Sequence, residues 1–374
     1  MIKITNSIKQ FIKKETVLFL SGLLAILTMV LVPPSQDYIT YIDFRVLGLL
    51  FCLMAVVAGF DETGIFVLLS EKLLMRVANT RSISFVLVML CFLSSMWITN
   101  DVALITFVPF AILILTMADQ RKYLIRIIVL QTIAANLGSM LTPVGNPQNL
   151  YLYSYYNVPA GEFLGITFPF VILSGLLLWI CICFLPKEHI SFTLQNDKKA
   201  NRNRPRYILL YGALFLVCLA CVLRLLDYRV TLFLVFFSIL LLDRKVLRKV
   251  DYFLLLTFVC FFIFVGNLGS IPVVRDTLAS MLKSRELLLS VLASQLISNV
   301  PAAVLLSAFT GEYKALILGT DIGGLGTLVA SLASLISYKF YCRAAEEGKS
   351  RYLKVFTLYN LIFLIILCLF YLMI

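Results

Sequence analysis

The sequence predicts an all-α membrane protein that crosses the bilayer many times. Of its 374 residues, 61% are hydrophobic and 14% are charged, against about 45–50% and about 25% in soluble domains. The apolar residues form successive runs, many of them long enough for a helix to cross a hydrocarbon core of roughly 30 Å. This pattern excludes a soluble enzyme, a disordered chain and a disulfide-rich secreted domain. A membrane β-barrel is disfavoured because its strands alternate polar and apolar residues, which the run 361–374 does not.

The apolar runs divide into full spans and two segments of another kind. We expect about nine full spans: 17–33, 45–60, 122–156 (interrupted), 163–185, 207–224, 229–242, 252–267, 313–340 (interrupted) and 352–373. Two further apolar segments, 84–117 and 286–310, have polar centres. We predict that each is a re-entrant hairpin, in which two half-length helical arms meet at a tip inside the membrane.

The distribution of basic residues supports this plan. The formal net charge is +12, and most Lys and Arg lie between apolar runs, which is typical of the positive-inside rule and argues against nucleic-acid binding. With a cytoplasmic N-terminus, most basic loops fall inside if 84–117 enters and leaves on one side. The basic residues that this plan places outside are Arg224, Arg229, Arg275, Lys283 and Arg285. We therefore expect a multi-pass protein of the cytoplasmic membrane, with its N-terminus in the cytoplasm.

A polar segment separates two halves with the same order of features. Residues 186–206 form a predicted cytoplasmic linker between 1–185 and 207–374. Each half has a hairpin tip with an asparagine (Asn100, Asn299), followed by an interrupted span with a glycine (Gly138, Gly323) and a threonine (Thr142, Thr327). The plan above makes the two hairpins enter from opposite faces. Inverted repeats with interrupted spans are typical of secondary transporters, whose site lies near the membrane midplane.

The interruptions predict what such a site could hold. Gly138, Pro143, Gly145 and Pro147 cannot share one regular helix, and freed backbone groups cannot face lipid. Their carbonyl groups could hold a cation, whereas the N-termini of half-helices favour an anion. No basic residue lies at either tip. An alternative is that the glycines serve only close helix packing.

Two carboxylates lie within the predicted membrane region, at Asp101 and Asp321. Carboxylates there are costly and usually functional, so we expect either to carry a coupling proton or cation. The alternatives are that Asp101 caps the second hairpin arm and that Asp321 donates or accepts a structural hydrogen bond. Asp61 and Glu62, at a predicted cytoplasmic end, are expected to be solvated.

Other chemistries find little support. The nine cysteines lie mostly in apolar runs, where cysteine behaves as a small hydrophobe, and the single histidine, His189, lies in a basic loop. We expect no enzyme activity, no organic cofactor, and no metal site beyond sodium. A non-transporting membrane scaffold remains a remote alternative.

Four segments contain recognisable motifs: 99–104 (TNDVAL), 136–150 (NLGSMLTPVGNPQNL), 298–302 (SNVPA) and 323–327 (GGLGT). They resemble the motifs of the ion transporter superfamily, which includes citrate-transporter-like proteins, divalent anion/sodium symporters, arsenite permeases and NhaD-type sodium/proton antiporters. Residue by residue, these motifs are most similar to those of the arsenite-permease-like branch and its short bacterial relatives.

The resemblance implies a scaffold part and a mobile part, elevator-type alternating access and, in many members, a homodimer. It implies a small anionic or oxyanion substrate and a coupling sodium ion or proton. Residues expected to contact substrate are Thr99, Asn100, Ser298, Asn299, Thr142 and Thr327. Those expected to bind or couple ions are Ser95, Asn100, Asp101, Gly138, Asn299, Asp321 and Gly323.

Two departures from the symporter pattern bear on substrate. Asp101 and Val300 stand where the symporters carry threonine, so two hydroxyls are lost and a carboxylate is gained. A dicarboxylate would meet this negative charge unless Asp101 were protonated or paired with a cation. The leading hypothesis is a secondary transporter of a small anion or oxyanion, driven by sodium or protons. The alternative is sodium/proton antiport or arsenite-type metalloid efflux centred on Asp101.

Overall fold

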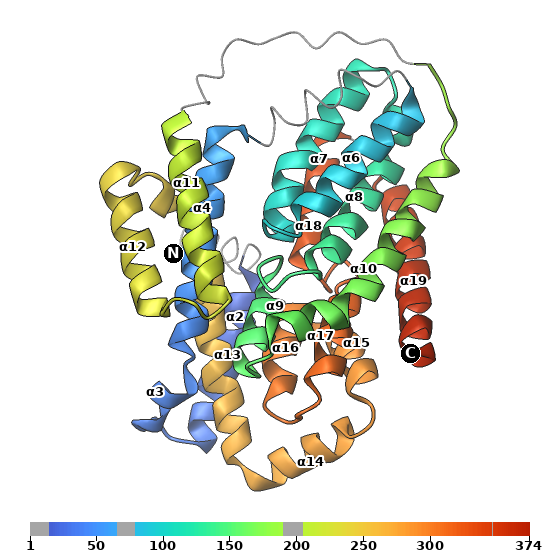
Figure 1. Ribbon diagram of the computed structural model, residues 1–374. Helices are drawn as coiled ribbons and strands as arrows, with labels where there is room; N and C mark the ends of the chain where they lie inside the picture. The colour runs from blue at the N-terminus through green and yellow to red at the C-terminus, as the bar shows by residue number, and fades with distance from the viewer. Residues whose placement is uncertain (1–14, 66–78, 190–204, 346) are drawn as a thin grey trace, which may run out of the picture.

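The computed structural model describes residues 15–65, 79–189, 205–345 and 347–374, and within these ranges it contains helices and no strand (Figure 1). Most of the predicted linker 186–206 lies outside the described residues. The helices of the first half are α2 (Thr16–Leu31), α3 (Asp37–Tyr41), α4 (Phe44–Thr63), α6 (Thr80–Ser94), α7 (Asn100–Met117), η1 (Arg121–Tyr123), α8 (Leu124–Ser139), α9 (Pro147–Tyr155) and α10 (Ala160–Cys183). Those of the second half are α11 (Pro205–Val222), α12 (Tyr228–Leu242), η2 (Val246–Lys249), α13 (Tyr252–Ser270), α14 (Pro272–Leu282), α15 (Glu286–Ile297), α16 (Asn299–Ser307), α17 (Tyr313–Gly323), α18 (Leu332–Ala344) and α19 (Lys349–Met373).

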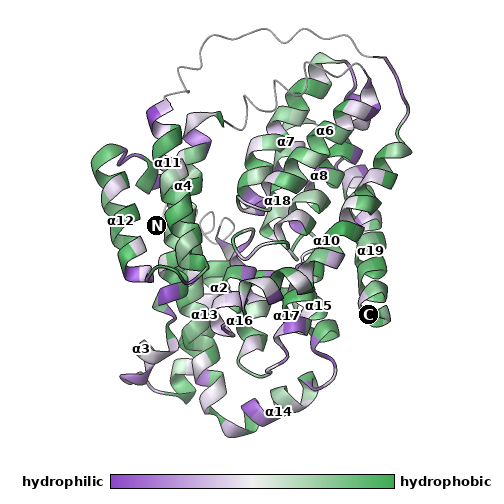
Figure 2. Ribbon diagram, in the orientation of Figure 1, coloured by the Kyte–Doolittle hydropathy of each residue, from purple (hydrophilic) through white to green (hydrophobic). Residues whose placement is uncertain are grey.

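The helices have the dimensions of a multi-pass membrane protein. Among the described residues, six are long and apolar enough to span a bilayer: α4, α7, α10, α11, α13 and α19. Figure 2 shows these helices as hydrophobic along most of their length, with hydrophilic residues gathered mainly near helix ends and in α14. Helices α2 and α12 are shorter, with 16 and 15 residues.

Both predicted interruptions are present. Helices α8 and α9 are separated by residues 140–146, which we call the first break, and α17 and α18 by residues 324–331, the second break. The end of the first break is set by two residues at the start of α9. Asn146 caps that helix by accepting a hydrogen bond from Asn149 N (2.9 Å), and Pro147 is its first residue. Proline is favoured at that first helical position because its missing N–H has no partner there.

The first hairpin consists of α6 and α7, with a turn at residues 95–99. Both of its ends meet Glu188: Thr80 N donates to the Glu188 carbonyl (2.9 Å), and Lys122 Nζ and Tyr123 OH contact its carboxylate (2.7 and 2.8 Å). The segment therefore returns to the end of the bundle from which it started. Its arms, of 15 and 18 residues, are longer than the predicted half-length arms. The helix begins earlier than the apolar run because Asn79 caps it, accepting from Ser82 N (3.0 Å).

The Glu188 contact is also pH-sensitive. The Lys122 ammonium and the Tyr123 hydroxyl hold the pKa of the Glu188 carboxyl below its ordinary value. The contribution of this contact to stability is therefore present at neutral pH and is lost as the pH falls through the lowered pKa.

The two halves share their hydrophobic cores. One cluster of buried side chains joins α6, α7, α8 and α10 to α18 and α19, and the other joins α4 and α9 to α11, α12, α13 and α16. The part of each interrupted helix that follows its break thus packs with the other half: α18 beside α7 and α8, and α9 beside α16 and α17. In Figure 1 the first hairpin and α8 lie in the upper part of the molecule, and α15, α16 and α17 lie in the lower part.

Candidate functional site

The two hairpin tips dock on the two breaks through equivalent backbone hydrogen bonds. Asn100 N donates to the carbonyl of Gly145 in the first break (3.1 Å), and Asn299 N donates to the carbonyl of Ala330 in the second (2.9 Å). In both tips the asparagine is the first residue of the second arm, and its Oδ1 accepts from the next backbone N–H, that of Asp101 or Val300 (3.0 Å each).

The threonines make a second matched pair of contacts. The Thr142 hydroxyl donates to the carbonyl of Met96, and the Thr327 hydroxyl donates to the carbonyl of Gln295 (3.4 Å). Met96 and Gln295 each lie four residues before the tip asparagine. Both predicted threonines therefore contact a hairpin in this structure, and Thr327 is exposed.

Gly138 and Gly323 lie where their helices press on the first arms of the hairpins. A Cβ at Gly138 would lie 2.1 Å from the Phe92 carbonyl oxygen and 2.5 Å from Ser95 Oγ, and one at Gly323 would lie 2.6 Å from Ser294 Oγ. Close packing thus requires glycine at both positions. The Gly138 carbonyl accepts from Leu141 N (3.2 Å) and the Gly323 carbonyl from Gln295 Nε2 (2.8 Å). The Gly138 carbonyl also accepts from Met140 N. A cation role for these two carbonyl groups stays a prediction.

Asn136 joins the two halves near the tips. Its Oδ1 accepts from Asn100 Nδ2 and from Ser331 Oγ (3.0 Å each), and its Nδ2 lies 3.5 Å from the Gly324 carbonyl oxygen. Gly324 also abuts Asn299, whose Nδ2 would lie 3.0 Å from a Cβ there. A chain of contacts therefore runs from Asn100 through Asn136 and Gly324 to Asn299.

The two predicted intramembrane acids have different surroundings. Asp321, on the last turn of α17, is 2% exposed, and its Oδ1 accepts from Asn146 Nδ2 (3.1 Å) and Gln148 Nε2 (3.3 Å). Asp101 is half-buried on the first turn of α7, and within the described residues its carboxylate accepts no hydrogen bond. The alternative that Asp101 caps α7 therefore has no supporting contact.

A cavity of about 410 Å³ lies beside the first hairpin tip. It is bounded by α4, α7, α9 and α13. Among its polar lining residues are Thr99, Asp101, Asn146, Lys249 and Asp251. The other predicted residues, Ser95, Asn100, Ser298 and Asn299, are buried at 0–4% exposure, close to the breaks rather than on the cavity wall.

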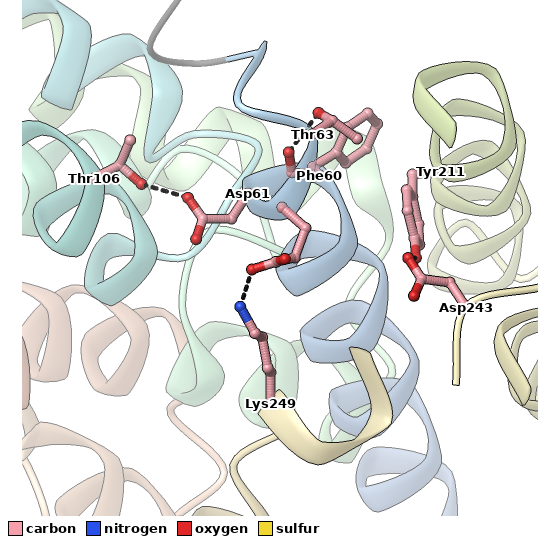
Figure 3. Close-up of polar contacts among 8 residues, drawn as sticks. Phe60, Asp61, Thr63, Thr106, Tyr211, Asp243 and Lys249 are labelled. Atoms are coloured by element: carbon pink, nitrogen blue, oxygen red, sulfur yellow. Dashed lines mark hydrogen bonds and ion pairs between the residues drawn. The ribbon is translucent and has the colours of Figure 1, made fainter. Parts of the chain in front are cut away.

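A larger cavity, about 630 Å³, lies at the end of α4 and is lined by residues of α4, α11 and α12. Figure 3 shows its surroundings: the Tyr211 hydroxyl donates to Asp243 (3.0 Å), Lys249 pairs with Glu62, and Thr106 of α7 donates to Asp61 (3.2 Å). This cavity contains no residue of either tip or break. We therefore place the candidate site at the tips, and we assign these contacts to holding α4 against its neighbours.

Several residues of this region were not predicted as site residues. Asn136, Asn146 and Gln148 lie within the motif 136–150, and Ser331 and Gln295 flank the second break and second tip. The signal available in the sequence was the concentration of side-chain amides in 136–149, which is unusual within an apolar region.

Comparisons with known proteins also point to membrane transporters. The model of a family described as citrate transporter matches residues 5–315. An uncharacterized transporter of Methanocaldococcus jannaschii is 32% identical over 87% of this chain and 90% of its own length. The inner membrane protein YbiR of Escherichia coli is 30% identical over 80% of each chain. The silicon efflux transporter LSI3 of Oryza sativa is 30% identical over 41% of this chain and 32% of its own length.

Proposed function

The chain belongs to the citrate transporter family, as its motifs predicted, and we propose that it moves a small anion or oxyanion across the cytoplasmic membrane by secondary active transport. The observation that carries the proposal is the matched docking of Asn100 and Asn299 on the two breaks. Two such tips, joined through Asn136, bring polar backbone and amide groups together inside an apolar bundle.

We propose that the halves are inverted repeats. In support, backbone and side-chain contacts recur at equivalent positions: the tip asparagine with a break carbonyl, the break threonine with the first arm, and the glycine with an arm serine. The distribution of Lys and Arg supports a cytoplasmic N-terminus and a cytoplasmic linker at 186–206 as part of the same proposal. Alternating access of the elevator type and a homodimer follow from the family resemblance and belong to the same proposal.

Substrate recognition would rest on the tips. Thr99, Asn100, Ser298 and Asn299 would contact the substrate directly, because α7 and α16 begin there and helix N-termini favour anions. Thr142 and Thr327 would act with them, by fixing the tip backbone. Ser95, Gly138 and Gly323 would contribute to binding the coupling ion. The partial relative named for silicon efflux supports an oxyanion or its acid as the class of substrate.

A second candidate function is sodium/proton antiport or arsenite-type metalloid efflux. It is favoured by the cavity, where Asp101 and Asp251 bring two carboxylates to the wall and Lys249, the lining cation, already pairs with Glu62. An anion entering this cavity would meet like charge, whereas a cation or neutral hydroxylated species would not.

The test is transport into proteoliposomes after a thermal-shift screen has identified an anion that stabilises the purified protein. Asn100→Ala and Asn299→Ala should each slow uptake by about tenfold or more, the effect of losing roughly 1.4 kcal/mol of binding. Asn360→Ala, which removes a buried amide of α19 bonded to the Phe356 carbonyl (2.8 Å), is the matched control and should leave uptake nearly unchanged. Full activity in both tip variants would refute the site.

A further inference from the structure

We infer that Asp321 and Asn149 form a binding site for a monovalent cation between the two interrupted helices. The inference deepens the proposed transport function and rests on it, since it gives the coupling ion a place. The site is separate from the hairpin tips: it lies where the end of α17 meets the beginning of α9.

The carboxylate of Asp321 is only partly satisfied. Its Oδ1 receives the two amide donors described above, whereas its Oδ2 is buried and has no hydrogen-bond partner within the described part of the chain. None of the ion pairs among the described residues includes Asp321. A buried carboxylate without a cationic partner is unfavourable in a membrane interior.

Asn149 supplies a second unsatisfied oxygen beside this carboxyl. Its side chain is fully buried next to Asp321, and its Nδ2 donates to the Met140 carbonyl (3.4 Å). Its Oδ1 has no hydrogen-bond partner in the described ranges. While Asp321 is ionised, both unsatisfied oxygens are acceptors, and one bound cation would satisfy both. Carboxylate and amide oxygens are the ligands that hard cations prefer.

The helix ends at this position have both polarities. Helices α8 and α17 end here, at Ser139 and Gly323, with partial negative charge, whereas α9 begins here with partial positive charge. The two side-chain oxygens, and not the helix ends, therefore carry the inference. Asn146 donates to Asp321 and also lines the cavity beside the first tip, so one side chain lies between Asp321 and that cavity.

The experiment measures the melting temperature of the full-length protein in detergent while sodium replaces choline at constant ionic strength, with lithium and potassium as further probes. The wild-type melting temperature should rise with sodium, because a ligand that binds only the folded state stabilises it. Asp321→Asn should abolish this rise, and Asn149→Ala should shift its midpoint to about tenfold higher sodium, as for a loss of roughly 1.4 kcal/mol. Each variant is compared with its own melting temperature in choline, so that a general loss of stability does not count.

Two matched controls should keep the sodium response. Asp61→Asn neutralises a carboxylate outside the site, and Asn267→Ala removes another buried amide whose Oδ1 is unpartnered among the described residues. A sodium response in Asp321→Asn equal to that of the wild type would overturn the inference. So would a wild-type melting temperature that follows pH but no alkali cation, since a proton shared by Asp321 and Asn149 would then occupy the position. If either result were obtained while transport still depended on Asn100 and Asn299, the cation site would be refuted and the proposed transport function would not.

Discussion

Asn136 shows how one side chain can connect the two halves of the chain at the candidate site. It accepts from Asn100 in the first half and from Ser331 in the second, and its amide nitrogen reaches Gly324. Each of these partners would be left without this hydrogen bond by a substitution of Asn136, and an unsatisfied buried polar group costs about 1–3 kcal/mol. The position of the two tips relative to each other therefore depends on the side-chain amide of Asn136.

Asp101 is the residue on which the two candidate functions differ. Its carboxylate lies on the cavity wall and accepts no hydrogen bond from the described residues, so it is available to a cation or a proton. If the protein is a proton-coupled antiporter, Asp101→Asn should abolish exchange driven by an imposed pH gradient, because the asparagine amide does not bind or release a proton at the pH of the assay. The measurement is substrate flux in proteoliposomes with the gradient imposed in either direction. Unchanged pH dependence in Asp101→Asn would exclude Asp101 as the coupling acid.

The sequence allowed the tip residues to be predicted but not the partners of Asp321. Asn100, Asn299, Gly138 and Gly323 could be selected because they occur in the same order in both halves of the sequence; their roles in binding stay a prediction. That Asp321 contacts Asn146 and Gln148 depends on how α9 packs against α17, elements more than 150 residues apart in the chain. No local pattern encodes that contact.

At the scale of elements, the hairpins depend on close contact between a first arm and the interrupted helix beside it. At Gly138 the nearest atom to an added Cβ is a backbone oxygen, which cannot rotate away, whereas at Gly323 it is the Ser294 hydroxyl. The first hairpin should therefore tolerate a methyl group less well than the second. The polar centres of 84–117 and 286–310 allowed both hairpins to be predicted, but not the 18-residue length of α7, which continues through Pro109.

We predict that Gly138→Ala destabilises the protein by about 1–3 kcal/mol, the usual cost of forcing a side chain into packed surroundings, and that Gly323→Ala has a smaller effect. Gly165→Ala in α10, where an added Cβ meets nothing within 4 Å, should leave stability unchanged or slightly higher. Thermal unfolding in detergent compares the three variants. Equal stability of Gly138→Ala and Gly165→Ala would show that this close approach does not exist.

At the scale of the whole molecule, the two halves exchange the second parts of their interrupted helices. Helix α18 packs with the first hairpin and α9 with the second, so neither half has a complete core of its own. The order of features in the sequence predicted two related halves. It could not predict this exchange, because polarity along the chain does not specify which apolar face packs against which.

The claim that two hairpins enter the membrane from opposite faces and return is tested most directly by thiol labelling. All nine native cysteines are free, so they are first replaced, and single cysteines are then introduced at Ser82 and Asp119 beside the first hairpin, and at Lys283 and Glu312 beside the second. A membrane-impermeant maleimide is applied to right-side-out and inside-out vesicles. We predict that Ser82 and Asp119 react only from the cytoplasmic side, and Lys283 and Glu312 only from the outer side. Reaction of Ser82 and Asp119 from opposite sides would show that the first hairpin crosses the membrane, and would contradict the account.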